Sequence, residues 1–204
     1  MATSERQPPA EPQLQPPGAG LPRMELLVSR VGFALMKPFV SRAGANRWFR
    51  AEADRILALA RSVPAADLTR RVLVPRLPGL EDSSRYWSVA MTLEHLAIVD
   101  AAVAGTVESL AAGVVPGRIA STADVKPGPG VDAGAIDRFE SAAREYLACV
   151  EAVADLRTRV TYPHPWFGEF TALNWHRLAA LHHRVHRKQV ERIVSLLPPQ
   201  PHAA

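Results

Sequence analysis

The stretch TALNWHRLAALHHRVHRKQVERIVSLL, residues 171–197, decides the fold of this chain. Its apolar residues recur at the spacing of one helical face: Leu178, Val185, Ile193 and Leu196. Two prolines follow directly, and proline cannot continue a helix. The pattern therefore predicts a long amphipathic helix from about Thr171 to Leu197.

Two histidines, His182 and His186, lie four residues apart on one face of this helix. Because Val185 and Ile193 mark the same face, we expect both imidazoles to point toward the core. An imidazole there without a partner costs about 1–3 kcal/mol. A divalent ion satisfies such a pair when another helix supplies a third ligand, and the resulting site keeps open positions.

His95 is the one histidine in the other predicted helices, near the inward edge of its own helix. Gln189 follows His186 by three residues on the same face and is a candidate to orient a ligand or hold a water. Histidine pairs four apart are also common on basic surface helices. The residues alone therefore leave two alternatives open: a metal site, or core histidines without a metal.

The rest of the chain reads as three further helices and two long connections. Helical spacing of apolar residues covers 46–63, 86–112 and 132–156, and strand-like alternation is absent. We expect Asp132 to cap the third of these helices. The connection 114–131 is rich in proline and glycine and long enough to cross over. The prediction is an all-α fold in which residues 44–198 form a four-helix bundle.

The N-terminal part differs in composition from the bundle. Residues 1–22 contain six prolines among small and polar residues, so we expect a disordered tail. Residues 23–43 are interpreted as an accessory helix and linker, with Met24, Leu27, Val28, Val31 and Leu35 on one face. That face suits either a membrane surface or the chain's own domain. We favour packing on the domain, because the charged residues nearby do not form a cationic face.

Composition excludes several classes of protein. The chain has 204 residues, 48% of them hydrophobic and 22% charged, and a net charge of +4. A single cysteine, Cys149, rules out an internal disulfide and multi-cysteine zinc sites, and it fits a cytoplasmic protein. We expect no membrane span and no export signal, and the weak positive charge argues against a nucleic-acid partner. We interpret Cys149 as a core residue and not a nucleophile.

Three motifs together resemble a known family. RYWSVAMTLEHL (85–96), with His95, and LHHRVHRKQ (181–189), with His182 and His186, resemble the DinB-like superfamily of metalloenzymes. The loop TYPHPWFGEF (161–170) is similar to a branch of unassigned function, in which a His-Pro-aromatic-aromatic-Gly loop precedes the last helix. The resemblance implies an up-down-down-up four-helix bundle and a metal triad of His95, His182 and His186.

The same resemblance implies a function. Relatives with assigned chemistry are transferases or isomerases that use low-molecular-weight thiols, and some are hydrolases. We therefore expect a metal-dependent enzyme whose zinc, nickel or iron ion activates a thiol or water for a small-molecule substrate. The alternative is a non-catalytic bundle that binds a metal or a partner protein, and a homodimer stays open.

The other histidines and the aromatic residues receive weaker assignments. His183 is interpreted as a surface residue or as one that supports a ligand without binding the metal, and His164 as a structural loop residue that could serve as a fourth ligand. His176 is expected to be solvated. The aromatic residues of the motifs line a pocket mouth or fill the core, and core packing is the safer interpretation: Trp87, Trp166, Phe167 and Trp175.

Overall fold

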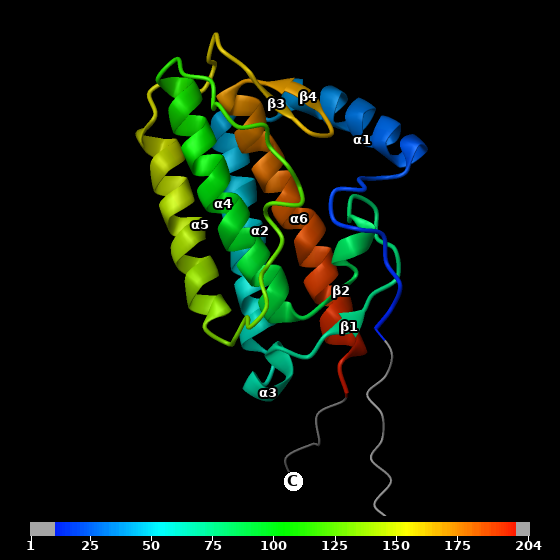
Figure 1. The fold of residues 1–204 in the computed structure, drawn as a ribbon. Helices are drawn as coiled ribbons and strands as arrows, with labels where there is room; N and C mark the ends of the chain where they lie inside the picture. Colours follow the sequence, from blue (N-terminus) through cyan, green and yellow to red (C-terminus); the bar gives the residue numbers. More distant parts are fainter. Residues whose placement is uncertain (1–10, 199–204) are drawn as a thin grey trace, which may run out of the picture.

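The computed structural model describes residues 11–198. Four long helices form the body of the fold, and short helices and hairpins connect them (Figure 1). The long helices are α2 (Arg42–Arg61), α4 (Val89–Ala111), α5 (Ala135–Ala152) and α6 (Ala172–Leu196). The shorter elements are α1 (Arg23–Met36), the 3-10 helix η1 (Lys37–Phe39), α3 (Ala65–Leu68), β1 (Val72–Leu73), the 3-10 helix η2 (Asp82–Ser84), β2 (Tyr86–Trp87), β3 (Tyr162–His164) and β4 (Gly168–Phe170).

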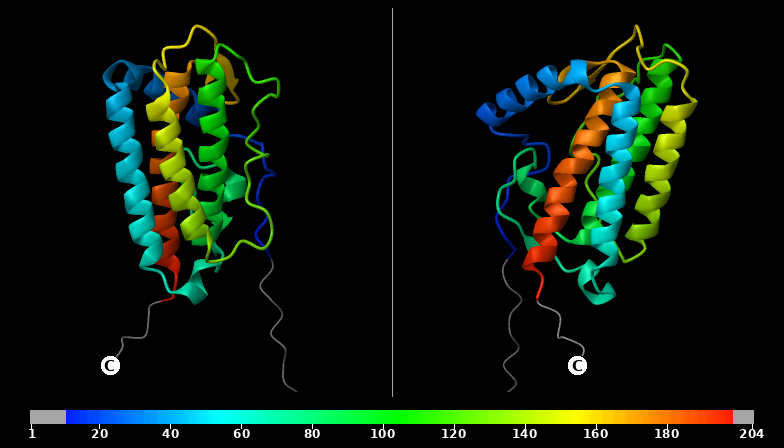
Figure 2. Two further views of the ribbon diagram at one scale, coloured as in Figure 1. Left: turned by 90° about the vertical axis from the view of Figure 1, so that its left-hand side faces the viewer. Right: turned by 180° about the vertical axis from the view of Figure 1, so that it is seen from behind.

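The predicted four-helix bundle with up-down-down-up topology is confirmed. In Figure 1, α2 and α6 run in one direction and α4 and α5 in the other. α4 packs against both α5 and α6, and α2 packs against α6 and α5. The connection between the parallel helices α4 and α5 runs back along the length of the bundle, as Figure 2 shows from the side. This crossover contains Val125, whose carbonyl oxygen contacts His95.

The ends of the long helices follow local capping signals. The hydroxyls of Ser41, Ser88 and Thr171 accept hydrogen bonds from backbone amides in the first turns of α2, α4 and α6. Gly113, with a φ of 77°, follows the C-cap of α4, in the left-handed region that glycine favours. Asp132 was expected to cap α5, but it accepts a hydrogen bond from the Gly134 amide in the turn before that helix.

Two antiparallel hairpins were not expected from the sequence. β1 pairs with β2, and β3 pairs with β4, with His164 opposite Gly168. Gly168 has a φ of 76°, which allows the turn to close. Strands of two or three residues are too short to display alternation, so the pattern that identifies a strand is absent from them.

The accessory helix α1 packs through a different face from the one predicted. Phe33 is buried and contacts the rings of Phe167 and Phe170 at centroid distances of 5.4 and 5.0 Å. The predicted apolar stripe is instead exposed: Met24, Leu27, Val28, Val31 and Leu35 are 51–71% exposed. The prediction that this stripe packs on the domain is therefore wrong. Helical periodicity identified the stripe correctly but not which side of the helix meets the bundle.

Residues 11–22, the described part of the predicted tail, have no helix or strand but contact the loop before β2. The amides of Gly18 and Gly20 both donate to the Glu81 carboxylate, at 3.0 and 2.9 Å. The Gln15 amide donates to Asp82 at 2.9 Å. Residues 1–10 lie outside the described part of the chain.

Helix α4 packs against α5 and α6 in the bundle. It is long and apolar enough to pass a length and composition test for a membrane span, which the sequence reading did not anticipate. Its buried face nevertheless carries polar residues, among them Thr92, His95 and Asp100, and this face meets α5 and α6. The apolar composition of α4 is thus that of a core helix in contact with several neighbours.

Candidate metal centre

Three histidines from two helices meet at one point in the bundle. His95 comes from α4, and His182 and His186 come from successive turns of α6. One ring nitrogen from each lies within 4.8 Å of the other two. The Nε2 atoms of His95 and His182 are 3.2 Å apart. Three imidazoles in this arrangement could hold a metal ion, since the distance between those two nitrogens is close to the separation of about 3.3 Å between two ligands of a tetrahedral zinc ion.

Two of the rings are oriented by contacts on their far side. The Nδ1 atom of His95 lies 2.7 Å from the carbonyl oxygen of Val125, in the crossover between α4 and α5. The Nδ1 atom of His186 lies 2.7 Å from the side-chain oxygen of Gln189. Both acceptors place the proton on Nδ1, which leaves the Nε2 lone pairs free for a cation. The Nδ1 atom of His182 is buried and has no hydrogen-bond partner within residues 11–198.

All three imidazoles are held in their neutral form. Burial lowers the pKa of His95 to about 4, although the Val125 carbonyl opposes the shift. Burial and the neighbouring imidazoles lower the pKa of His182 and of His186 well below the usual range. Because a metal binds neutral imidazole, the site is ready for a cation without releasing a proton at neutral pH.

A buried ion pair lies beside the triad. The Lys126 ammonium is 2.5 Å from the Glu81 carboxylate and donates to the Ser84 hydroxyl at 2.8 Å. Burial raises the pKa of Glu81, but the hydrogen bonds from Lys126 and the Gly20 amide outweigh it, so the net shift is downward. Burial lowers the pKa of Lys126, and Glu81 opposes that shift. Lys126 also lies over the ring of Trp87, at 5.3 Å.

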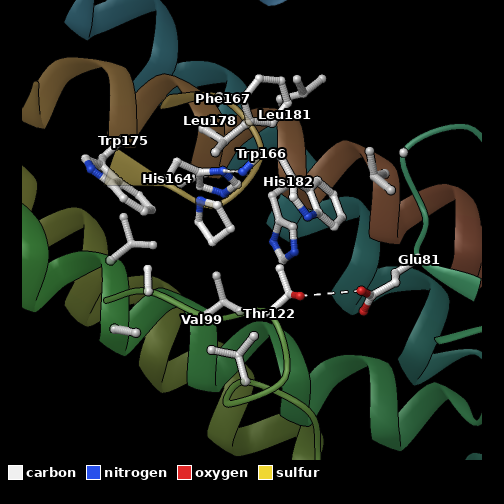
Figure 3. Close-up of a pocket in the computed structure, with 18 of the residues that line it drawn as sticks. Glu81, Val99, Thr122, His164, Trp166, Phe167, Trp175, Leu178, Leu181 and His182 are labelled. Atoms are coloured by element: carbon white, nitrogen blue, oxygen red, sulfur yellow. Dashed lines mark hydrogen bonds between the residues drawn. The ribbon is translucent and has the colours of Figure 1, made fainter. Parts of the chain in front are cut away.

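A cavity of about 610 Å³ opens onto the triad. Figure 3 shows part of its lining, with His164 and His182 on one side and Glu81 and Thr122 on the other. Most of its wall is apolar, and the larger apolar residues include Phe33, Val99, Val103, Ile119, Trp166, Phe167, Trp175, Leu178, Leu181 and Val185. The volume lies in the range of small-molecule sites, so an apolar compound has room beside the histidines.

The four aromatic residues of the motifs lie in two different places. Trp166, Phe167 and Trp175 line the cavity, so the preference for plain core packing does not hold for them, although Trp175 is also buried. Trp87 is buried against the triad, and its ring is nearly parallel to that of His186, with centroids 6.3 Å apart.

The structure separates the remaining histidines. His183 is fully buried and bonded to the Asp100 carboxylate at 2.9 Å, so it is not a surface residue. His164 lines the cavity but is not one of the three converging rings. His176 is fully buried, with its Nδ1 atom 2.9 Å from the Tyr146 hydroxyl. The prediction that His176 is solvated is therefore wrong, because α6 is enclosed on more sides than its apolar stripe indicated.

Cys149 lies partly buried on α5, where its thiol donates weakly to the Ala104 carbonyl at 3.7 Å. Burial raises the pKa of this thiol to about 11, so it is protonated at neutral pH. This agrees with the expectation that Cys149 is not a nucleophile.

Sequence reasoning missed the residues that surround the triad from loops and from α4. Glu81, Lys126 and the Val125 carbonyl lie in connections without periodicity, and no spacing rule predicts their proximity to the histidines. Asp100 had a detectable signal. It is a carboxylate among apolar residues in the middle of a helix, five residues after His95, and such residues are usually paired.

Comparison with known proteins identifies the family. Residues 49–190 match the DinB superfamily, which is about two-thirds of the chain and includes all three histidines. No curated protein matches. A crystal structure of TT2238, described as a four-helix bundle protein, is 27% identical, with 74% of this chain and 98% of that chain covered and a TM-score of 0.49. With the match across the bundle and the three-histidine cluster inside it, the chain belongs to the DinB superfamily.

Proposed function

We propose that this protein is a metal-dependent enzyme in which His95, His182 and His186 hold a divalent ion of zinc, nickel or iron. The observation that carries the proposal is the orientation of the triad. Three neutral imidazoles converge, and two have their far nitrogens bonded to acceptors, Val125 and Gln189. Membership of a superfamily that often binds metal supports the same assignment.

The donor set and its surroundings fit a catalytic ion better than a purely structural one. Three protein ligands leave coordination positions open, whereas structural zinc sites are closed by four. The triad also lines a cavity with room for a small molecule. When bound, the ion would lower the pKa of a low-molecular-weight thiol or of water toward neutrality and so provide a nucleophile. We therefore propose a thiol-dependent transferase or a hydrolase.

The surrounding residues have separable roles in this proposal. The Val125 carbonyl and Gln189 hold the protons of His95 and His186 away from the site. The apolar wall excludes water from the reacting groups, which strengthens electrostatic interactions there. Lys126 lines the cavity as a cation paired with Glu81.

Elemental analysis of untagged protein tests the metal site. We expect about one ion per chain in the wild type and loss of the ion in His95→Ala and in His182→Ala. His176→Asn is the matched control, because His176 is also buried on α6 but lies outside the triad. If the wild-type protein binds none of the three ions, the proposal is refuted.

A second measurement separates an open catalytic ion from a closed structural one. Cobalt-substituted protein is titrated with 2-mercaptoethanol while the near-ultraviolet spectrum is recorded. An open position gives a sulfur-to-cobalt charge-transfer band that saturates with thiol. No band, together with a large loss of melting temperature in His182→Ala, would favour the alternative of a non-catalytic metal-binding bundle.

A further inference from the structure

His164 presents a polar group to the cavity that neither the fold nor the triad uses. It ends β3, and its Nδ1 atom accepts a hydrogen bond from the Trp166 backbone amide at 3.1 Å. An accepting Nδ1 in a neutral imidazole places the ring proton on Nε2. Within residues 11–198, Nε2 has no hydrogen-bond partner. His164 therefore carries a spare N–H donor beside the cavity.

The surroundings of this donor are almost entirely aromatic. The ring centroids of Trp175 and Phe167 lie 5.1 and 5.2 Å from that of His164, and that of Phe170 lies 5.8 Å away. Burial lowers the pKa of His164 to about 3, so the ring is uncharged at neutral pH. An N–H donor beside these rings gains most from a neutral acceptor, because the charged side chains that line the same cavity are paired with each other, Lys126 with Glu81 and Arg118 with Asp124.

The cavity wall continues this apolar character away from His164. Leu178, Leu181 and Val99 line the space in Figure 3, and Phe33 of α1 also belongs to the lining. The triad is a separate polar region of the same cavity, since His164 does not converge with it. A ligand that fills the cavity would have an apolar body and one acceptor at His164.

We propose that this cavity binds a neutral carbonyl compound with an alkyl or aryl body, and that His164 donates its Nε2 proton to the carbonyl oxygen. The assignment rests on the proposed function in that the carbonyl compound is the substrate of the adjacent triad. The binding itself uses groups that are present without an ion.

Isothermal titration with acetophenone and ethylbenzene tests the assignment, because the two probes differ in shape mainly by the carbonyl oxygen. Both are expected to bind the wild-type protein. Butyrophenone is expected to bind more tightly than acetophenone, by about fourfold for each added methylene.

Two variants separate the donor from the loop contact of His164. His164→Asn keeps an acceptor near the Nδ1 position for the Trp166 amide but loses the Nε2 donor, whereas His164→Gln keeps a donor near Nε2 and loses that acceptor. We expect His164→Asn to weaken acetophenone about fivefold with ethylbenzene unchanged, and His164→Gln to keep the wild-type ratio of the two affinities. If His164→Gln loses the preference for acetophenone over ethylbenzene and His164→Asn keeps it, the proposal is refuted and His164 has only a structural role in its loop.

The titrations are repeated after chelation, with the metal content measured in each sample. If the carbonyl preference and its dependence on His164 persist without metal, the inference stands even where the proposed metal chemistry fails. If the preference disappears with the metal, the carbonyl lies at the triad and the role of His164 is refuted. Failure of all three probes to bind the wild type would refute the apolar site itself.

Discussion

The Nδ1 atom of His186 lies 2.7 Å from the Oε1 atom of Gln189, one turn further along α6. The amide nitrogen of Gln189 in turn donates to the Ser84 carbonyl at 2.8 Å. Gln189 is fully buried, so both bonds are shielded from water. One side chain thus fixes the tautomer of a candidate ligand and connects α6 to Ser84, whose hydroxyl accepts a hydrogen bond from Lys126.

Gln189→Met is expected to lower zinc affinity 10-fold to 100-fold, because it removes the acceptor that keeps the His186 proton on Nδ1. It also leaves the buried Ser84 carbonyl without its donor, which costs about 1–3 kcal/mol of stability. Competition with a chromophoric chelator measures the affinity. Lys188→Met, at the exposed neighbouring position, is the control and should bind zinc like the wild type. Equal affinities in the two variants would mean that Gln189 does not orient His186.

Acid should destabilise the protein through His176. Burial lowers its folded-state pKa to about 4, against about 6.5 when unfolded. Between these values the unfolded chain binds a proton that the folded chain refuses, so stability is lost as the pH falls from about 6.5 to about 4. The full effect is about 3 kcal/mol. Urea unfolding of chelated protein at several pH values measures it.

The variant for this test is His176→Asn, which keeps an acceptor near Nδ1 for the Tyr146 hydroxyl. Its stability should fall less steeply with acid than that of the wild type, while the other buried histidines contribute equally to both proteins. Parallel pH profiles for the two proteins would show that His176 is not responsible for the slope.

Because the apolar stripe of α1 is exposed, substitutions in the stripe should affect stability less than a substitution of the buried Phe33. Leu27→Gln and Val31→Gln should leave stability within about 0.5 kcal/mol, because both side chains are more than half exposed. Phe33→Ala should cost about 3 kcal/mol, because it removes a buried ring that stacks on Phe170. Urea unfolding followed by circular dichroism gives both values. A large loss in Leu27→Gln would mean that the stripe packs in solution.

How far the sequence leads can be seen by comparing α6 with α1. In α6, the pattern predicted that His182 and His186 meet a third histidine from another helix, and they do. It did not identify the most buried side of that helix, where His176 and His183 lie. In α1, five apolar residues form an equally clear stripe, yet that stripe is exposed and Phe33 makes the contact. Periodicity identifies a face, and only the neighbouring elements determine what that face meets.

The candidate site contains residues from helices, which the sequence predicted, and residues from loops, which it did not. The three histidines are on helices, where spacing fixes direction, and the sequence predicted that they meet. Lys126 and Glu81 lie in loops separated by 44 intervening residues, so their pairing depends on how the crossover returns along the bundle. Pairings between irregular segments have no sequence period, which is why the ion pair and the Val125 contact were found only in the structure.

The buried pair of Asp100 and His183 should behave as a unit in stability measurements. The carboxylate and the ring nitrogen are 2.9 Å apart, both residues are fully buried, and burial raises the pKa of Asp100 against the attraction of His183. Asp100→Leu should cost about 3 kcal/mol, because it leaves the imidazole buried without its partner.

The double variant carries the decisive comparison. His183→Phe places an apolar ring between Phe49 and Phe139, whose centroids lie 4.0 and 5.5 Å from that of His183. Asp100→Leu combined with His183→Phe should therefore be more stable than the sum of the single changes implies, by at least about 1 kcal/mol. Urea unfolding of the wild type, the two single variants and the double variant gives the four free energies of this double-mutant cycle. Chelation removes any contribution from metal at the adjacent His182. Strictly additive effects would show that the carboxylate and the imidazole are buried independently and that neither depends on the other for its place in the core.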